Sequence, residues 1–381
     1  MLRIGSLGAG GRGTLCQLVH RPQEGVELTA ICDLDPKVHD DYRKTVRPDI
    51  AVYTDYRRML AEAALDAVFV TTPDFLHEAM AVAALERGIA VYLEKPMAIT
   101  VEGCDRILRA ARKSKAKLYV GHNMRFFPVI RTMKQIIDSG RIGPVQAIWC
   151  RHFVGYGGDA FFKDWHSERK YTTGLLLQKA AHDIDVIHYL AGAYTVRVVG
   201  MGRLSVYNQV TDRRQPGERS KKDDWSLSDW PPLAQKKLSP VIDVEDHSMI
   251  LMQLASGAQA SYQQCHYTPD SHRNYTVIGT QGRIENCGDF STEAAEAVIR
   301  IWDRRVGYLE NGTEAVSVPP ILGSHGGADP LIVDDFLGYL KTGRREGADP
   351  LDARAAVAAG CLATQSLREG NQPFDVPEFR G

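Results

Sequence analysis

A glycine-rich turn near the start of the chain constrains its fold more than any other feature. Residues 8–13 read G-A-G-G-R-G, between an apolar run at 2–7 and an amphipathic stretch. In a G-x-G-x-x-G turn the first glycine permits the tight turn, the second admits a pyrophosphate, and the third lets helix and strand pack closely. The N-terminus of the next helix offers free N–H groups to the phosphates. The turn therefore predicts dinucleotide contacts from Gly8, Gly10, Gly11, Arg12 and Gly13.

The surrounding sequence alternates short apolar runs with helical patterns. Helical patterns cover 75–87 and 101–114. The apolar runs lie at 2–7, 26–32, 67–71, 90–93 and 117–120. This rhythm indicates βαβ units and a parallel sheet. We expect an α/β protein whose residues 1–122 form a Rossmann dinucleotide-binding domain.

An aspartate ends the second expected strand. Asp33 follows Gly13 by about 20 residues, where an acidic side chain binds the ribose hydroxyls of NAD and repels a 2′-phosphate. Asp33 therefore favours NAD over NADP, although a capping role is the alternative for it. Arg12 weakens the preference, because an arginine beside this position can accommodate a phosphate.

Two further loops follow expected strands and so reach the edge where open α/β sheets bind ligands. The first predicts cofactor contacts from Thr71, Thr72, Pro73 and His77. The second reads Glu94-Lys95-Pro96, and the proline restricts Lys95 to extended conformations. A partly buried lysine beside a nicotinamide is expected to have a lowered pKa and to exchange a proton with a substrate hydroxyl. A surface lysine in a loop is the alternative.

At these motifs the chain resembles the Gfo/Idh/MocA family, the group of glucose-fructose oxidoreductase and inositol dehydrogenase. The resemblance covers residues 1 to about 290 and continues more loosely to the end. It rests on the glycine turn, Asp33, the segment 71–77, Glu94-Lys95-Pro96, G-H-N-M-R-F at 121–126, I-G-P-V at 142–145 and H-D-I-D at 182–185.

The resemblance implies several properties of the site. It implies a cis peptide before Pro96, a catalytic Lys95, and positions near nicotinamide and substrate for Asn123 and Arg125. It also implies that Glu94 contacts the cofactor. A second domain, whose exposed sheet face mediates association, would make a homodimer or homotetramer.

The pattern after residue 122 predicts this second domain over 123–381. Alternating segments between 145 and 285 indicate a large, mostly antiparallel open sheet with helices on one face, an α+β arrangement. A charged, tryptophan- and proline-rich segment at about 206–240 indicates an insertion loop. A late helix is expected at about 355–367.

A helix expected over 174–190 carries the second catalytic candidate. On it Gln178, His182 and Asp185 share one face, and Lys179 borders that face. The family match makes His182 a proton relay or substrate anchor. Many family members have an aspartate where this chain has Gln178, so Gln178 and Lys179 are predicted substrate contacts with an altered proton relay.

Three weaker candidates complete the predicted substrate site. Tyr156 and Trp165 lie in a polar, aromatic segment that suits a sugar, or in an ordinary loop. His325 lies in the turn-rich sequence S-H-G-G-A-D at 324–329, which could bring it to the site.

Composition excludes other classes of function. A net charge of -1 gives no sign of a nucleic-acid or membrane partner. Seven scattered cysteines, without a C-x-x-C pair, indicate neither a disulfide framework nor a zinc site, so we expect no metal. A strand pattern beginning at Leu2 leads us to expect no signal peptide, and the scattered cysteines fit a reducing cytoplasm.

These features predict an NAD-dependent oxidoreductase that acts on a secondary hydroxyl of a sugar, glycoside or cyclitol, with a Lys95/His182 acid–base pair. The alternative is an NAD-dependent glycosidase or lyase that works by transient oxidation, elimination and re-reduction. A non-catalytic NAD sensor is a third possibility, disfavoured by the presence of both Lys95 and His182.

Overall fold

The computed structural model describes residues 1–218, 220, 224–226, 228–288, 296–319 and 323–381. They form two compact units. The first contains 1–126, 323–354 and 379–381, and the second contains 127–322 and 355–378. The boundary expected after residue 122 lies near the first crossing, but the later return of the chain to the first unit had no signal in the sequence pattern. Positions 219, 221–223 and 227 of the expected insertion lie outside the described residues.

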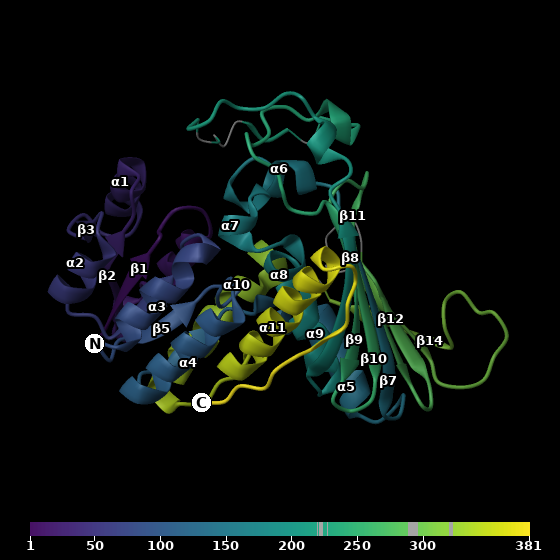
Figure 1. Cartoon of the computed structure of the whole chain (residues 1–381). Coiled ribbons are helices and arrows are strands. Elements are labelled where there is room, and N and C mark those ends of the chain that lie inside the picture. The colour runs from purple at the N-terminus through teal and green to yellow at the C-terminus, as the bar shows by residue number, and fades with distance from the viewer. Residues whose placement is uncertain (219, 221–223, 227, 289–295, 320–322) are drawn as a thin grey trace. The chain divides into compact units, whose positions relative to one another are not determined.

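The first unit is built on a six-stranded parallel sheet with the order β3-β2-β1-β4-β5-β6. Its strands are β1 (Leu2–Leu7), β2 (Val26–Cys32), β3 (Ala51–Tyr53), β4 (Ala67–Val70), β5 (Ala90–Leu93) and β6 (Leu118–Val120). Helices α1 (Pro36–Thr45), α2 (Tyr56–Glu62), α3 (His77–Leu85) and α4 (Val101–Ser114) pack around it (Figure 1). Strand order reverses between β1 and β4, which is where Rossmann sheets bind ligands. The Rossmann prediction is confirmed.

The segment after the glycine turn is a 3₁₀ helix, η1 (Gly11–Val19), where a helix of the α type is usual. The Gly13 N–H already donates to the Gly10 carbonyl at 2.8 Å, which is the i to i−3 pattern of this tighter helix.

The returning segment belongs to the core of the first unit. Helix α10 (Ala328–Thr342) places Phe336 edge-on against Phe69, with ring centroids 5.3 Å apart, and against Tyr92 at 5.4 Å. The Tyr119 hydroxyl donates to Asp335 Oδ2 at 2.7 Å. Aromatic burial of this kind fixes α10 to the sheet strongly.

The second unit is built on a mixed sheet, mostly antiparallel, with the order β14-β13-β12-β11-β7-β10-β9-β8-β15 among the described residues. The strands are β7 (Val145–Val154), β8 (Thr195–Arg203), β9 (His247–Leu254), β10 (Gln259–Cys265), β11 (Ser271–Gly279), β12 (Arg283–Cys287), β13 (Ala297–Trp302), β14 (Glu314–Val318) and β15 (Phe374–Asp375). Among the described strands of this sheet, only β7 and β10 pair in parallel. The predicted open sheet is confirmed.

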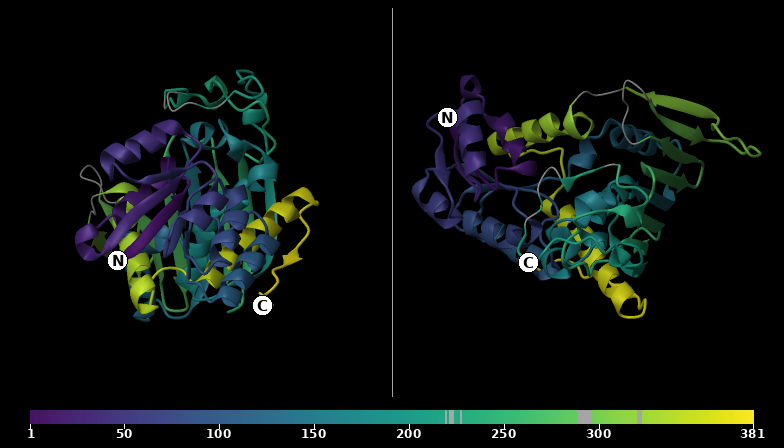
Figure 2. Two further views of the ribbon diagram at one scale, coloured as in Figure 1. Left: turned by 90° about the vertical axis from the view of Figure 1, so that its left-hand side faces the viewer. Right: turned by 90° about the horizontal axis from the view of Figure 1, so that it is seen from above.

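Helices cover one face of this sheet. They are α5 (Pro128–Asp138), α9 (Ala180–Ala191) and the part of α11 (Pro350–Arg368) after residue 354 (Figure 1). The alternation of exposed and buried residues along β9 shows that the opposite face is open, as a two-faced strand requires. In Figure 2, the green strands at the edge of the sheet extend beyond these helices. Helix α11, at Pro350–Arg368, is longer than the late helix predicted over about 355–367.

Two regions of the second unit have irregular structure, and one of them differs from expectation. The helix predicted over 174–190 is divided at Lys179 into α8 (Leu175–Gln178) and α9. The described part of the insertion packs against α6 (Gly157–Phe161), where Phe161 and Phe162 share a core with Tyr207. Asp246 anchors the start of the insertion, because its Oδ2 accepts the N–H of Val206 at 2.7 Å.

In the described part of the chain, no helix combines the length and the apolar character needed to cross a bilayer.

Candidate functional site

The glycine turn has the geometry of a phosphate cradle. Gly8 has a φ of +79°, which disfavours any other residue. A Cβ on Gly13 would lie 2.2 Å from the Gly8 carbonyl oxygen, so only glycine fits there. Thr71 donates its hydroxyl to the same oxygen at 2.5 Å and so ties the turn to the end of β4. These residues fit the pyrophosphate of a dinucleotide.

Asp33 stands at the end of β2 and holds the turn in place. Its Oδ2 accepts the N–H groups of Ala9 at 2.9 Å and Gly10 at 3.1 Å, and its Oδ1 accepts that of Asp35 at 3.0 Å. A carboxylate offers about four acceptor positions, so ribose hydroxyls can still be bound. A capping role was the alternative for Asp33, but the side chain that caps α1 is that of Asp35.

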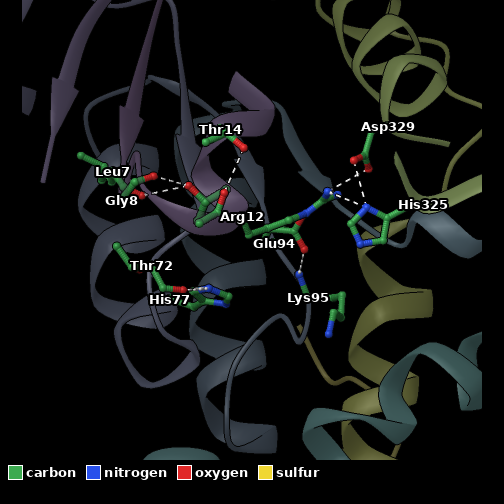
Figure 3. A network of polar contacts seen from close by, with 12 residues as sticks. Leu7, Gly8, Arg12, Thr14, Thr72, His77, Glu94, Lys95, His325 and Asp329 are labelled. Atoms are coloured by element: carbon green, nitrogen blue, oxygen red, sulfur yellow. Dashed lines mark hydrogen bonds and ion pairs between the residues drawn. The ribbon is translucent and has the colours of Figure 1, made fainter. Parts of the chain in front are cut away.

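Arg12 is engaged by two carboxylates of the first unit (Figure 3). Its Nε donates to Glu94 Oε1 at 2.7 Å and its Nη1 to Asp329 Oδ1 at 2.8 Å. Burial acts to lower the pKa of Arg12, but the charges of Glu94 and Asp329 outweigh it and raise that pKa overall. An arginine paired in this way is poorly placed to bind the 2′-phosphate of NADP. Arg12 therefore no longer weakens the expected preference for NAD.

Glu94 and Lys95 follow β5 at the same sheet edge. Glu94 is buried, and its Oε2 accepts the backbone N–H of Lys95 at 3.1 Å. Burial acts to raise the pKa of Glu94, yet Arg12 and then Lys95 lower it overall, so Glu94 is ionised. The peptide bond between Lys95 and Pro96 is cis, as the resemblance implied.

His77 connects the two loops that follow β4 and β5. It is fully buried, and its Nδ1 lies 2.8 Å from the Pro96 carbonyl oxygen while its Nε2 lies 2.8 Å from that of Thr72. Each ring nitrogen thus lies against a backbone carbonyl oxygen, and this ties the loop that contains Thr72 and Pro73 to the loop at Pro96. The predicted contact of His77 with the cofactor stays a prediction.

Asn123 and Arg125 lie on η4 (Asn123–Phe126), directly after β6. Both side chains are buried, and Arg125 Nη1 forms an ion pair of 3.0 Å with Asp352 Oδ2. The sequence did not reveal this partner, because Asp352 is more than 200 residues away. Arg125 is thus anchored within the first unit, and its contact with substrate stays a prediction.

His325 lies beside Arg12 in the first unit. Its Nδ1 is 2.9 Å from Asp329 Oδ2 and 3.3 Å from Arg12 Nη1. The structure therefore gathers Arg12, Glu94, Lys95 and His325, four of the predicted residues, around one network (Figure 3). Asp329 was missed, although its position four residues after His325 was a usable signal.

Three predicted substrate residues gather in the second unit. Lys179 Nζ donates to the Tyr156 hydroxyl at 3.0 Å and lies 5.4 Å from the centre of the Phe161 ring. Trp165 stacks on His166, with centroids 3.6 Å apart, and His166 packs edge-on against Phe161 at 5.4 Å. Phe161 is therefore the hub of this cluster, and an aromatic surface with a cation suits a polyhydroxylated ligand.

The predicted substrate residues on the expected helix lie on both sides of the break between α8 and α9. Gln178, at the end of α8, is buried, and its Oε1 has no hydrogen-bond partner among the described residues. His182 is half-buried on α9, and Asp185 is buried. Because Lys95 and His182 belong to different units, their convergence on one hydroxyl stays a prediction.

A buried polar cluster in the second unit was not predicted. Asp183 forms an ion pair of 2.8 Å with Arg273 and lies 3.3 Å from His152 Nδ1. Burial, followed by the charge of Arg273, lowers the pKa of His152 to about 3. His266 is also fully buried, and burial lowers its pKa well below the ordinary value. Both imidazoles are therefore neutral at pH 7.

Two family models match this chain. The N-terminal one, described as an oxidoreductase family NAD-binding Rossmann fold, matches residues 2–122. The C-terminal alpha/beta domain of the same family matches residues 134–376. The chain belongs to the Gfo/Idh/MocA oxidoreductase family. It therefore carries the NAD-binding Rossmann domain of that family.

Curated relatives agree with this assignment. YteT of Bacillus subtilis, named as an oxidoreductase, is 27% identical over 91% of this chain and 89% of its own length. The inositol 2-dehydrogenase of Burkholderia multivorans is 32% identical, over 50% of this chain and 55% of its own length. The match to that dehydrogenase thus spans about half of each protein.

Solved structures show the same fold. A complex of levoglucosan dehydrogenase with NADH and L-sorbose superposes with a TM-score of 0.78 at 19% identity, covering 100% of both chains. A dehydrogenase from Thermotoga maritima superposes with a TM-score of 0.71 at 18% identity and the same coverage.

Proposed function

We propose that this protein is an NAD-dependent dehydrogenase that transfers a hydride between a secondary hydroxyl of a sugar, glycoside or cyclitol and the nicotinamide. One observation carries the proposal. Arg12 of the glycine turn grips Glu94, and Glu94 holds the backbone of Lys95, so the turn and the lysine are fixed to one another. The backbone of the residue that would transfer the proton is thereby fixed at the sheet edge where the dinucleotide would bind.

NAD is the preferred cofactor in this proposal. The carboxylate of Asp33 would face the 2′ position of the ribose, where it repels a phosphate. Arg12 cannot offset that repulsion while Glu94 and Asp329 hold it. Gly8, Gly10, Gly11 and Gly13 would hold the pyrophosphate, and Thr71 would keep the turn closed behind it.

The residues of the chain divide the chemistry among them. Bound NAD supplies the acceptor of the hydride. Lys95 takes the proton from the substrate hydroxyl as the carbonyl forms and returns it in the reverse direction. His182 holds the same hydroxyl and relays its proton, and Asn123 and Arg125 position the substrate from the first unit.

The second unit would supply the contacts that select the substrate. The cluster of Tyr156, Trp165 and Lys179 offers aromatic faces and hydrogen-bond donors, which suit the C–H faces and hydroxyls of a sugar. Gln178 binds a hydroxyl but takes up no proton, since an amide is neutral. The relatives named as inositol 2-dehydrogenase and the fold neighbour levoglucosan dehydrogenase act on compounds of this class.

A screen of substrates tests the proposal. The protein is incubated with a panel of sugars, glycosides and inositols and either NAD or NADP, and NADH absorbance and product chromatography are recorded. We expect NADH to accumulate with at least one member of the panel. Cleavage of a glycoside without lasting NADH would favour the alternative, in which transient oxidation acidifies a neighbouring C–H bond and permits elimination. No turnover of any kind, with NAD still bound, would contradict both.

A lysine variant then tests the catalytic role. Lys95→Ala should lower kcat about 10²- to 10⁴-fold, the usual contribution of a general acid–base group, and should leave the Kd of NAD nearly unchanged. Lys113→Ala, at an exposed position of α4, is the matched control and should retain full activity. Retention of activity by Lys95→Ala would contradict the mechanism.

A further inference from the structure

Four neighbouring strands of the second unit bring a row of side chains together on one face of the sheet. The strand register pairs Arg203 of β8 with His247 of β9, and His247 with Cys265 of β10. Phe153 of β7 lies beside Cys265 on the next strand. Side chains of directly paired residues point to the same face and lie about 5 Å apart. The row Arg203–His247–Cys265–Phe153 therefore crosses the sheet from β8 to β7.

This row lies on the face of the sheet that the helices leave open. Arg203 is exposed, and the other three residues of the row are half-buried. Successive residues of a strand point to opposite faces. The residues next to the row along three of these strands are buried, namely Ser248, Gln264 and His152. The row therefore lies on the face opposite to α9 (Figure 1).

A pocket opens over the row. Its cavity volume is about 400 Å³. Small-molecule sites usually have volumes of about 300–1,000 Å³. All four residues of the row line the pocket, together with Met201, Met249 and Tyr267. None of the catalytic, cofactor or substrate residues predicted from the sequence is among the described residues that line it.

Arg203 supplies the charge of this pocket. It is the one arginine, lysine or carboxylate among the described lining residues. No hydrogen bond or ion pair joins its guanidinium group to another described residue. Asp246 is buried, and its Oδ2 accepts the N–H groups of Val206 at 2.7 Å and Tyr207 at 3.0 Å, so this carboxylate is engaged by the backbone. The pocket thus offers a planar cation to an anionic ligand.

The other walls of the pocket are apolar and ordered. Met201 and Met249 are paired across β8 and β9, and both are exposed. The Tyr267 hydroxyl lies 3.1 Å from His247 Nδ1, and the two rings pack edge-on with centroids 5.8 Å apart. Thioether and aromatic side chains pack well against an apolar group. Rings that are already held in place lose little conformational entropy when a ligand binds.

We propose that this pocket binds a small amphipathic monoanion. Its carboxylate pairs with Arg203, and its aromatic or aliphatic part packs against Phe153, Met201 and Met249. A neutral sugar would leave Arg203 without a counter-charge. Because α9 carries His182 on the opposite face of the sheet, the pocket is a second site of the chain. Binding at this site does not depend on the proposed function.

Calorimetric titration with hydrocinnamate tests the ligand class. This probe joins one carboxylate to a benzene ring through a short chain, hydrocinnamide is its neutral counterpart, and acetate lacks the ring. We expect hydrocinnamate to bind at least about 10-fold more tightly than either. Arg203→Gln should raise its Kd about 10-fold. Arg197→Gln, which changes an exposed arginine of the same strand outside the pocket, is the matched control and should leave the Kd unchanged.

Cys265 reports where the probe binds. Its thiol is half-buried in the pocket, so saturating hydrocinnamate should slow its alkylation by iodoacetamide, followed by peptide mass spectrometry. Cys287 of β12 is also half-buried and lies outside the pocket, so its alkylation rate is the internal control and should not change. Binding without any protection of Cys265 would place the probe elsewhere and overturn the proposal.

Two further results would also overturn the proposal. Equal affinity for hydrocinnamate and hydrocinnamide would remove the role of Arg203 and with it the ligand class. Absence of binding would show that the pocket takes no such ligand. If light scattering then shows that Arg203→Gln changes the oligomeric state, a second copy of the chain fills the pocket instead.

Discussion

At the scale of single residues, Asp33 has two tasks that one variant can separate. It holds the glycine turn through two N–H groups and is expected to hold the ribose. Asp33→Ala should raise the Kd of NAD about 10- to 100-fold, since hydrogen bonds to a charged group contribute about 1.5–3 kcal/mol, and should raise that of NADP less. Fluorescence titration measures both constants. Asp35→Ala, which removes only the cap of α1, should weaken stability by about 1 kcal/mol without changing either Kd.

The buried histidines of the second unit predict acid sensitivity. The pKa of His152 is about 3 in the folded chain, below its ordinary value of 6.5, and that of His266 is also lowered. Between pH 3 and pH 6.5 these histidines bind more protons in the unfolded chain than in the folded chain. The free energy of unfolding therefore rises with pH, and this stability is lost as the pH falls below about 6.5. Each histidine should contribute about 1.4 kcal/mol per pH unit.

Denaturant unfolding at pH 7, 6 and 5 checks this dependence. His266→Phe, in a site already lined by Phe161 and Phe162, should lower the slope between pH 6 and 5 to about half, because His152 still titrates. An unchanged slope in this variant would show that His266 is protonated in the folded protein.

At the scale of elements, helix α10 is tethered by two ion pairs of unequal burial. Arg12 joins Asp329, whose side chain is 8% exposed, and Arg21 joins Asp334, whose side chain is 53% exposed. Arg12→Met leaves Glu94 and Asp329 as buried carboxylates without their cation, which should cost about 3 kcal/mol of unfolding free energy. Arg21→Met should cost less than about 1 kcal/mol. Denaturant titration compares the two, and equal losses would contradict the burial argument.

Helix and strand patterns were predictable to different degrees. The bounds of β1, β2, β5 and α4 were those expected, because period and flanking turn residues agree there. The break at Lys179 was not predicted, since it lies inside a continuous apolar pattern. Helix α10 was also not predicted, because the turn-rich sequence directly before it indicates a loop.

At the scale of the whole molecule, the open face of the sheet in the second unit predicts self-association. Leu251 of β9 is 56% exposed, and Met201 on the neighbouring strand β8 and Trp149 on β7, beyond β10, are exposed on the same face. A second copy of the chain would cover these apolar side chains, as an oligomer interface requires. Leu251→Asp should convert a homo-oligomer to a monomer in light scattering. Leu233→Asp, equally exposed on the insertion at 54%, should not.

The sequence by itself determined the Rossmann domain, the glycine turn, Asp33 and the Glu94-Lys95-Pro96 loop. Each of these depends on local periodicity or on residue types at fixed spacing, which a linear reading preserves. Only the tertiary structure decided that Arg12 pairs with Glu94 and Asp329, that Arg125 pairs with Asp352, and that the ring nitrogens of His77 lie against two backbone carbonyl oxygens. Those partners are brought together by the return of residues 323–354 and by packing between loops, and the free energy of such contacts between distant residues leaves no periodic mark in the sequence.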